Sequence, residues 1–356
     1  MALTEYGVNA NEAVKLWSRT IWEETIKAAV MMDLVGTDTD SVVTAQEELS
    51  KSAGDRIRMP LRMALLGDGV EGDSTLENNE ERLLTYTDDL IINQLRHAVR
   101  SSGEMTEQRV PWNLREQGMN GLRDWWAERL DVSIINQLSG NTAITDTKYS
   151  GHNATIAPST TSGNTRILFG GGTSTTENSL SIGSETFSLT YIDRALLQAQ
   201  VATPALRKAN TPWGKKYVWI GHPRQIRDLQ ITNVAATVNW FTIQQAMLQG
   251  GQEKKSNGIF SGALGTYKDV ILLSDNRIPA APNTTNVFRS LFCGAQAGLM
   301  GYGKRYGNRR MSWKEKLFDF DNQLGIKAGM IWGCKKTVFN SRDHGVIVVS
   351  SYGQPV

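Results

Sequence analysis

The sequence "RMPLRMALLGDGVEGDSTLENNEERLLTYTDDLII" (residues 58–92) places two strand-like stretches on either side of an acidic, glycine-rich middle. Residues 55–66 alternate apolar side chains with basic or small ones, which is the period of a β-strand. Residues 83–95 are rich in strand-favouring types, and residues 67–82 have the composition of a turn. We therefore predict that residues 54–100 form a long two-stranded hairpin.

This predicted hairpin is long compared with the body of the protein. At ~3.3 Å per residue its first strand spans ~35 Å, whereas a compact chain of 356 residues has a radius of gyration of ~20 Å. Pro60 removes one amide N–H from the first strand, so that strand suits the edge of a sheet. The hairpin either lies across a domain or projects beyond it. If it projects, something else must hold it, because a lone two-stranded hairpin is barely stable in water.

The composition is that of an ordinary folded protein with nearly balanced charge. Of the 356 residues 40% are hydrophobic and 21% charged, and 38 basic against 36 acidic residues leave a net charge of +2. This balance excludes the global basic field of proteins that coat nucleic acid or anionic membranes. Two cysteines exclude a disulfide framework and favour a reducing compartment. Without a secretory signal or an apolar run of ~20 residues, we expect cytoplasmic synthesis and no membrane partner.

Two helices are predicted in the first half of the chain. Residues 10–34 carry apolar side chains at helical spacing after a polar start, which predicts an N-terminal arm with an amphipathic helix. Residues 113–139 have the strongest helical pattern, with Asn113 as a cap and Gly140 as a stop. At 1.5 Å per residue this helix is ~40 Å long, enough to act as a spine.

The rest of the chain mixes short strands and helices. Residues 140–188 are dominated by Ser, Thr, Asn and Gly, so we expect a loop-rich surface flap with a short strand around Arg166–Phe169. Strand and helix patterns then follow one another irregularly, which favours an α+β fold. The last two strands, in 324–340 and 344–351, are predicted to pair antiparallel.

No stretch has the spacing of a catalytic, cofactor or metal site. The four histidines share no metal-ligand spacing with each other or with the cysteines. The serine of "GIFSG" (258–262) is one place late for a nucleophile elbow, and "FGGGTSTT" (169–176) lacks the lysine of a phosphate-binding loop. "GDGVEGDS" (67–74) lacks the ligand ladder of a calcium loop. We therefore predict no enzyme activity, no catalytic residue, no cofactor and no metal.

One segment, "KRYGNRRMSWKEK" (304–316), interleaves basic residues with two aromatic ones. Its candidate contact residues are Lys304, Arg305, Arg309, Arg310 and Lys314. Basic residues beside aromatic rings can hold a nucleic-acid backbone. They can equally form a solvated face, or complement the acidic turn 67–82 of a neighbouring copy. The near-neutral charge of the chain favours these last two interpretations.

The order of these elements resembles that of the tailed-phage major capsid proteins with the Hong Kong 97-type fold. That fold has an N-terminal arm, an extended loop, a peripheral domain with a long helix, and an axial domain. In its amino-acid sequence the chain most resembles the major capsid proteins of N-four-like podophages. The resemblance is carried by "VKLWSRTIWEETIKAAVMMDLVG" (14–36), by the hairpin 54–100 and by "NLREQGMNGLRDWWAERLDVSIINQLSG" (113–140). It covers nearly the whole chain and is weakest at 140–188.

The resemblance implies a domain organisation for the chain. Its parts are an N-terminal arm (1–35), an extended hairpin loop (54–100), a peripheral part (101–189) with the spine helix 113–139 and the insertion 140–188, an axial domain (190–305), and a return to the peripheral sheet (306–356). In that fold the extended loop lies over an adjacent subunit, which would explain how the hairpin is held.

The resemblance also implies a function. The chain would be the major capsid protein of a tailed double-stranded DNA bacteriophage, made in the bacterial cytoplasm and located in the virion. It would assemble with itself into hexamers and pentamers of an icosahedral shell that encloses the genome. Its other partners would be scaffolding, portal and decoration proteins, with packaged DNA at the inner face bound without sequence specificity.

The hairpin and the N-terminal arm supply the expected subunit-interface residues. They are Arg58 and Arg62 on the basic side of the first strand, Glu71, Asp73, Glu77, Glu80 and Glu81 in the acidic turn, and Trp17 and Trp22 in the arm. Three alternatives stay open: another oligomerising virion protein, a DNA-binding protein that uses residues 304–316, and an enzyme with an unfamiliar site. DNA binding would weaken steeply with salt, and an enzyme would remain a small oligomer.

Overall fold

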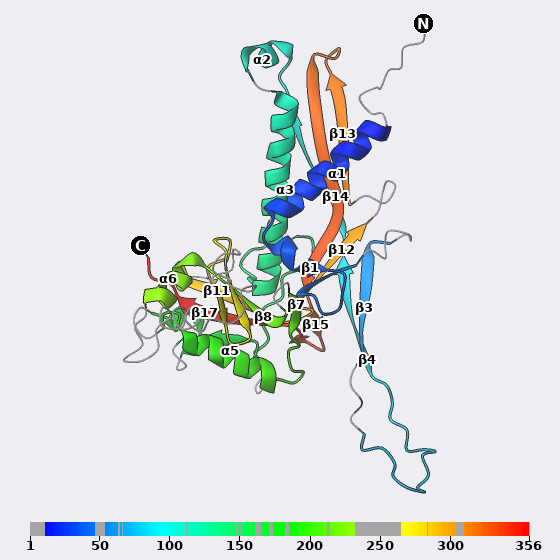
Figure 1. Cartoon of the computed structure of the whole chain (residues 1–356), viewed down its shortest axis with the longest axis vertical. Coiled ribbons are helices and arrows are strands. Elements are labelled where there is room, and N and C mark those ends of the chain that lie inside the picture. The colour runs from blue at the N-terminus through cyan, green and yellow to red at the C-terminus, as the bar shows by residue number, and fades with distance from the viewer. Residues whose placement is uncertain are drawn as a thin grey trace, which may run out of the picture.

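The computed structural model is an elongated molecule with a hairpin that extends from one end (Figure 1). It describes residues 11–46, 54–62, 65, 67–111, 113–146, 149, 151–160, 165–170, 174–181, 185–211, 214–231, 265–282, 284–303 and 310–355. These residues form both helices and sheets, so the predicted α+β class is confirmed. Within them, no helix is long and apolar enough to cross a membrane.

A six-stranded sheet forms the long body of the molecule. Its strands are β1 (Val35–Gly36), β2 (Val43–Gln46), β5 (Asn93–Arg100), β12 (Gly298–Gly303), β13 (Met311–Phe318) and β14 (Gln323–Lys336). The pairs β1–β2 and β2–β12 are parallel and the others antiparallel. β12 and β13 follow one another along one edge of β14, and β5 pairs with the opposite edge.

Two helices, α1 (Asn11–Ala28) and α3 (Leu114–Ser139), cover one face of this sheet (Figure 1). The predicted spine helix is confirmed, because the side chain of Asn113 accepts a hydrogen bond from the Arg115 amide and Gly140 takes a left-handed conformation after the last turn. The buried stripe of α3, which includes Leu122 and Trp126, shares one core with the inward side chains of β13 and β14. Short helices η1 (Met31–Leu34) and α2 (Glu104–Arg109) follow α1 and precede α3.

A seven-stranded sheet forms the second part of the molecule. Its strands are β6 (Ile167–Phe169), β7 (Ala209–Thr211), β8 (Gly214–Gly221), β9 (Gly265–Tyr267), β10 (Val270–Ser274), β11 (Val287–Cys293) and β17 (Val346–Tyr352). One face packs on α5 (Leu189–Val201) and α6 (Pro223–Ile231) in a core that contains Phe187, Trp219 and Phe292. The other face shares its core with the C-terminal half of α3. The expected short strand near Arg166–Phe169 is confirmed as β6.

The predicted hairpin exists but is shorter than 54–100. β3 (Arg56–Arg62) pairs antiparallel with β4 (Thr85–Ile91) as a separate two-stranded sheet. Residues 93–100 leave the hairpin after Ile92 and become β5, which pairs with β14. The strand pattern of 83–95 continues across this point, so alternation alone could not show that the chain changes its partner there.

The expected antiparallel pairing of 324–340 with 344–351 is wrong. β14 lies in the six-stranded sheet, whereas β17 lies between β6 and β11 in the seven-stranded sheet. Only the two-residue strands β15 (Val338–Phe339) and β16 (Arg342–Asp343) pair across the turn between them. The physical reason is burial: β17 is apolar on both faces, which suits the centre of a sheet covered on both sides.

Each sheet takes strands from more than one of the expected segments, and the assignment of these segments to peripheral and axial domains stays a prediction. β12, within the segment 190–305 expected to be axial, belongs to the six-stranded sheet, and 306–356 supplies strands to both sheets. The segment 140–188 is more than a surface flap, because Asn153 and Ser159 are buried between the parts of the chain that they join.

Candidate functional site

The hairpin base is fixed to the body of the protein by a small core of its own. Ile57 and Met59 from β3 and Leu90 from β4 pack with Ile92 and with Leu299 of β12. These side chains point to one side because a strand alternates its side chains with a period of two. The apolar alternation that predicted the strand therefore serves to dock the hairpin base on its own subunit, and only the part beyond this base projects.

Hydrogen bonds of two buried side chains, Asn153 and Asp88, also hold the hairpin base to the body of the protein. Asn153 is 5% exposed, and its side chain accepts a bond from the Ile91 amide at 2.9 Å. Its amide nitrogen donates to the carbonyls of Ile91 and Cys334 at 2.8 and 3.1 Å. Asp88 of β4 accepts bonds from the Lys335 ammonium and from the Val338 amide. Because Asn153 and Asp88 are only 5% and 6% exposed, water competes little for their side chains, and these bonds set the direction in which the hairpin leaves the body.

Beyond this base the hairpin is exposed and carries the acidic turn. The five predicted acidic contact residues are all solvent-exposed: Glu71, Asp73, Glu77, Glu80 and Glu81. Within the turn, the Glu81 carboxylate accepts a bond from the Gly67 amide at 2.7 Å, which draws the two sides of the loop together. The exposed leucines of this region are Leu65, Leu76, Leu83 and Leu84. Figure 1 shows this part extending away from both sheets.

The two predicted basic residues of the hairpin both belong to β3. Arg58 donates to the Asp89 carboxylate at 2.8 Å, and this bond lowers the pKa of Asp89 below its ordinary value. Arg58 therefore helps to pair β3 with β4 inside its own subunit. Arg62 occupies the last position of β3, opposite Thr85. Their contacts with a neighbouring subunit stay a prediction.

The face of the six-stranded sheet opposite the helices is basic. Cross-strand pairing places five cations on this one side: Arg96, Arg100, Lys314, Lys316 and Lys327. We call this surface the basic face. In the paired stretches of β5, β13 and β14 that the structure describes, no acidic residue lies on this side. On this face the Phe318 ring packs against Gly325, and the side chains of Arg96 and Ser312 lie against Gly329.

The described cations of the basic segment 304–316 do not lie together on one surface. Lys304, Arg305 and Arg309 lie outside the described residues. Arg310 stacks over the rings of Trp22 and Tyr302, at 5.4 and 4.8 Å from the ring centroids, so it serves a contact within the subunit. Lys314 belongs to the basic face. One patch with all five predicted cations is therefore not supported by the described residues.

The two tryptophans expected at an interface lie in α1. Trp22 is half-buried and meets Tyr302 edge-on, with the ring centroids 5.8 Å apart. It therefore holds α1 to β12 of its own chain, and a contact with another subunit stays a prediction. Trp17 lies in the described part of α1, and its side chain lies outside the described residues.

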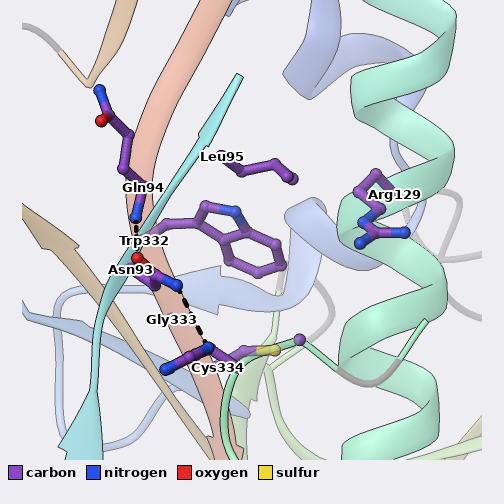
Figure 2. A pocket seen from close by; sticks show the side chains of 9 residues that line it. Asn93, Gln94, Leu95, Arg129, Trp332, Gly333 and Cys334 are labelled. Atoms are coloured by element: carbon purple, nitrogen blue, oxygen red, sulfur yellow. Dashed lines mark hydrogen bonds between the residues drawn. The ribbon is translucent and has the colours of Figure 1, made fainter. Parts of the chain in front are cut away.

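A small pocket lies beside the hairpin base, between β5, β14, α3 and residues 151–152 (Figure 2). It has a volume of about 90 Å³, and its lining includes Arg129, His152, Trp332 and Cys334. Burial raises the pKa of the Cys334 thiol to about 12, so this sulfur stays protonated and is a poor nucleophile. Among the described residues, no three His, Cys, Asp or Glu side chains are placed to hold a metal ion. The pocket thus offers neither an activated nucleophile nor a metal centre.

Buried charges join α3 to residues of the seven-stranded sheet and the loop before it, and local sequence patterns did not reveal them. Asp131 of α3 is fully buried and accepts bonds from the Val30 and Met31 amides, each at 3.0 Å, and from Arg277. Burial raises the pKa of Asp131 to about 6, against the opposing effect of Arg277. Near the end of α3, Arg289 of β11 forms an ion pair with Glu177 and donates to the Gly140 carbonyl.

Comparison with known proteins identifies the class to which this architecture belongs. A family model described as phage capsid protein matches residues 5–354. The chain belongs to the phage capsid protein family. It is 27% identical over 380 residues to the major capsid protein of Pseudomonas phage KPP25, covering 97% of this chain and 96% of that protein. This family is one of structural proteins and not of enzymes.

Solved capsid structures share the fold of this phage capsid protein. The capsid of Ralstonia phage GP4 superposes with a TM-score of 0.78 at 30% identity, covering 92% of both chains. The capsid of cyanophage Pam1 gives a TM-score of 0.69 at 19% identity, covering 92% of this chain and 93% of that one. The capsid fold expected from the order of elements is therefore confirmed.

Proposed function

We propose that this protein is the major capsid protein of a tailed phage, and that its hairpin clamps an adjacent subunit in rings that build the icosahedral shell. The observation that carries this proposal is the contrast within the hairpin. Its base is fixed by a core and by polar anchors, whereas its distal part is exposed, acidic and rich in leucine. Because the base fixes the direction of the hairpin while its distal part extends away from the body of its own subunit, the distal part is suited to contact another subunit.

The surface that receives the acidic turn is the basic face of a neighbouring copy. The turn presents Glu71, Asp73, Glu77, Glu80 and Glu81, and the basic face carries five cations without an intervening acid in the paired stretches of its strands. Complementary charge guides the encounter and sets the orientation, while burial of the exposed leucines adds affinity. The whole chain, with 38 basic and 36 acidic residues, has a net charge of only +2, so charge attraction between copies is local to such patches.

A contact between an arm on one copy and a face on the next is of the head-to-tail kind. Such contacts close into rings when the rotation per subunit allows it, here as hexamers and pentamers. Many such contacts in one shell give high overall stability, although each is modest by itself. Scaffolding, portal and decoration proteins, and DNA at the inner face, complete the set of proposed partners in the virion.

Assembly of the expressed protein tests this function. We would compare the intact chain with a variant whose residues 67–82 are replaced by a short turn, using size-exclusion chromatography and negative-stain electron microscopy. The intact chain should form capsomer rings or shells, and the shortened chain should not. Rings formed equally well by the shortened chain would contradict the clamp.

Charge reversal locates the contact more sharply. E77K/E80K/E81K in the turn and R96E/R100E on the basic face should each weaken assembly, and the two sets combined in one chain should restore it. Restoration is the informative control, because two sets that merely damaged folding would not rescue one another. Binding of the intact protein to DNA with a steep salt dependence would instead favour the DNA-binding alternative.

A further inference from the structure

Two arginine side chains are buried in the described part of the chain, and one of them, Arg289, has its charge fully matched. Arg289 is 6% exposed, and its guanidinium donates to both carboxylate oxygens of Glu177 at 2.7 and 2.8 Å. Its remaining nitrogen donates to the carbonyls of Ser139 and Gly140. The carboxylate offsets the charge, and each nitrogen of the guanidinium has an acceptor.

The other buried arginine, Arg166, lies immediately before β6 and has no comparable set of partners. Its Nη2 donates to the Pro204 carbonyl at 2.9 Å, whereas its Nε and Nη1 have no hydrogen-bond partner among the described residues. Within those residues no carboxylate forms an ion pair with it. A guanidinium keeps its proton, and a buried charge without a counter-ion is strongly unfavourable. A group that accepts these N–H bonds is therefore expected beside Arg166.

The charges around Arg166 favour an anion over a water molecule as this acceptor. Lys336, also fully buried, forms an ion pair with Asp343 at 3.0 Å, and Asp343 accepts a further bond from the Ser159 amide. Burial lowers the pKa of Arg166, Asp343 opposes this shift, and Arg342 adds to it. Two buried cations, Arg166 and Lys336, thus lie near one buried carboxylate. Water would accept the N–H bonds but would leave one positive charge without compensation.

Polar groups without partners also occur beside this cluster, in the hairpin of β15 and β16. Thr337 Oγ1 and His344 Nδ1 are buried, and neither has a hydrogen-bond partner among the residues that the structure describes. The His344 amide donates to the Thr337 carbonyl at 3.1 Å. Burial lowers the pKa of His344 to about 4, with smaller contributions from Arg207 and Arg166, so its ring is neutral at pH 7. A hydroxyl and a neutral imidazole can each donate one bond to an anion.

We propose that Arg166 binds one small monovalent anion of the halide class, such as chloride. Full burial of the side chain in a packed core leaves no room for a larger oxyanion such as phosphate. The ion would lie where Arg166 before β6, Pro204 after α5 and Lys336 at the end of β14 come together. Because β14 belongs to the six-stranded sheet and β6 to the seven-stranded sheet, the bound ion stabilises the junction between them. This binding is a property of the single subunit and is independent of the hairpin clamp.

Unfolding of unassembled subunits in different salts tests the inference. Chloride would replace gluconate stepwise at constant ionic strength, and unfolding by urea would be followed by tryptophan fluorescence. If one ion is released on unfolding, the unfolding equilibrium constant should fall about tenfold between trace chloride and a concentration about ten times the Kd. Arg166→Met should lose this dependence. Arg194→Met is the matched control, because half-buried Arg194 of α5 donates to the Phe169 carbonyl, and this variant should keep the dependence.

Bromide locates the ion directly, and it does so even where Arg166→Met fails to fold. In crystals of the wild-type chain grown in sodium bromide, anomalous diffraction should show one bromide within hydrogen-bond distance of the Arg166 guanidinium. No anomalous signal beside Arg166 would overturn the inference, since a water molecule or a protein group would then be the acceptor. An unfolding constant of the wild type that does not respond to chloride, or a response of equal size in Arg166→Met, would overturn it as well.

Discussion

Replacing Asn153 by alanine should loosen the hairpin where it leaves the body of the protein. The substitution removes three hydrogen bonds, to the Ile91 amide, the Ile91 carbonyl and the Cys334 carbonyl. It leaves one buried and two partly buried backbone groups without that partner, and an unsatisfied buried group costs about 1–3 kcal/mol. Because water can reach part of the opened site, we expect a total loss of about 2–4 kcal/mol in the free energy of unfolding.

Hydrogen exchange and urea unfolding of unassembled subunits would measure this effect. The amides of residues 85–92 should exchange faster in Asn153→Ala, while those of α3 should change little, because the loss is local to the hairpin base. Asn79→Ala is the matched control, since Asn79 lies in the same hairpin and makes one exposed bond to the Thr75 carbonyl. It should change stability by no more than about 0.5 kcal/mol. Equal exchange and equal stability for the two variants would refute the anchoring role of Asn153.

Three further variants test other parts of the structure. Gly333→Ala places a Cβ 2.2 Å from the Ile91 carbonyl oxygen, so we expect a loss of about 1–3 kcal/mol in urea unfolding, or an insoluble protein. Gly121→Ala, within α3 and with no atom within 4 Å of the new Cβ, should instead stabilise the subunit by about 1 kcal/mol; a loss at Gly121 would contradict the open surface there. Asp131→Asn tests the buried carboxyl, whose pKa is raised to about 6 in the folded protein. A raised pKa means that the folded state binds more protons than the unfolded state, so the contribution of Asp131 to stability is present below pH ~4 and is lost as the pH rises through about 6. The unfolding free energy of the wild type minus that of Asp131→Asn should therefore fall between pH ~4 and ~7, and a difference that is constant across this range would show that Asp131 titrates normally.

Elements governed by neighbouring residues were predictable from the sequence. The spine helix was expected at 113–139 and is found at Leu114–Ser139, since capping by Asn113 and termination at Gly140 act within one turn. The strands of the hairpin follow from alternation in the same way. The capsid resemblance came from the order of such elements along the chain and is confirmed by the family match.

Strand partners were harder to predict than the strands themselves. The pattern of β17 showed a buried strand, but nothing in it distinguished β14 from β11 as the partner. Likewise, β4 and β5 form one continuous stretch of strand pattern, although they pair with β3 and β14. Each apolar strand can satisfy its backbone groups on several neighbours, so the choice depends on how the whole core packs.

Of the two candidate contact surfaces, one could be predicted from the sequence and the other only in part. The acidic turn was visible in the sequence because its five predicted contact residues all fall within residues 71–81. The basic face was visible only in part, because its cations come from β5, β13 and β14 and meet through cross-strand pairing. The segment 304–316 suggested a single patch, but Arg310 turns toward Trp22 and Tyr302 while Lys314 joins the sheet surface.

By itself the sequence determined the long helix, the hairpin with its acidic turn, and the absence of any recognisable catalytic spacing, because all of these are set by residues close together in the chain. Only the tertiary structure decided how the hairpin is held and aimed. Asn153 and Ile91 are 62 positions apart, and Asp131 and Arg277 are 146 apart. A hydrogen bond or ion pair over such a separation leaves no periodic trace in the sequence, since its partners are brought together only when the core has packed.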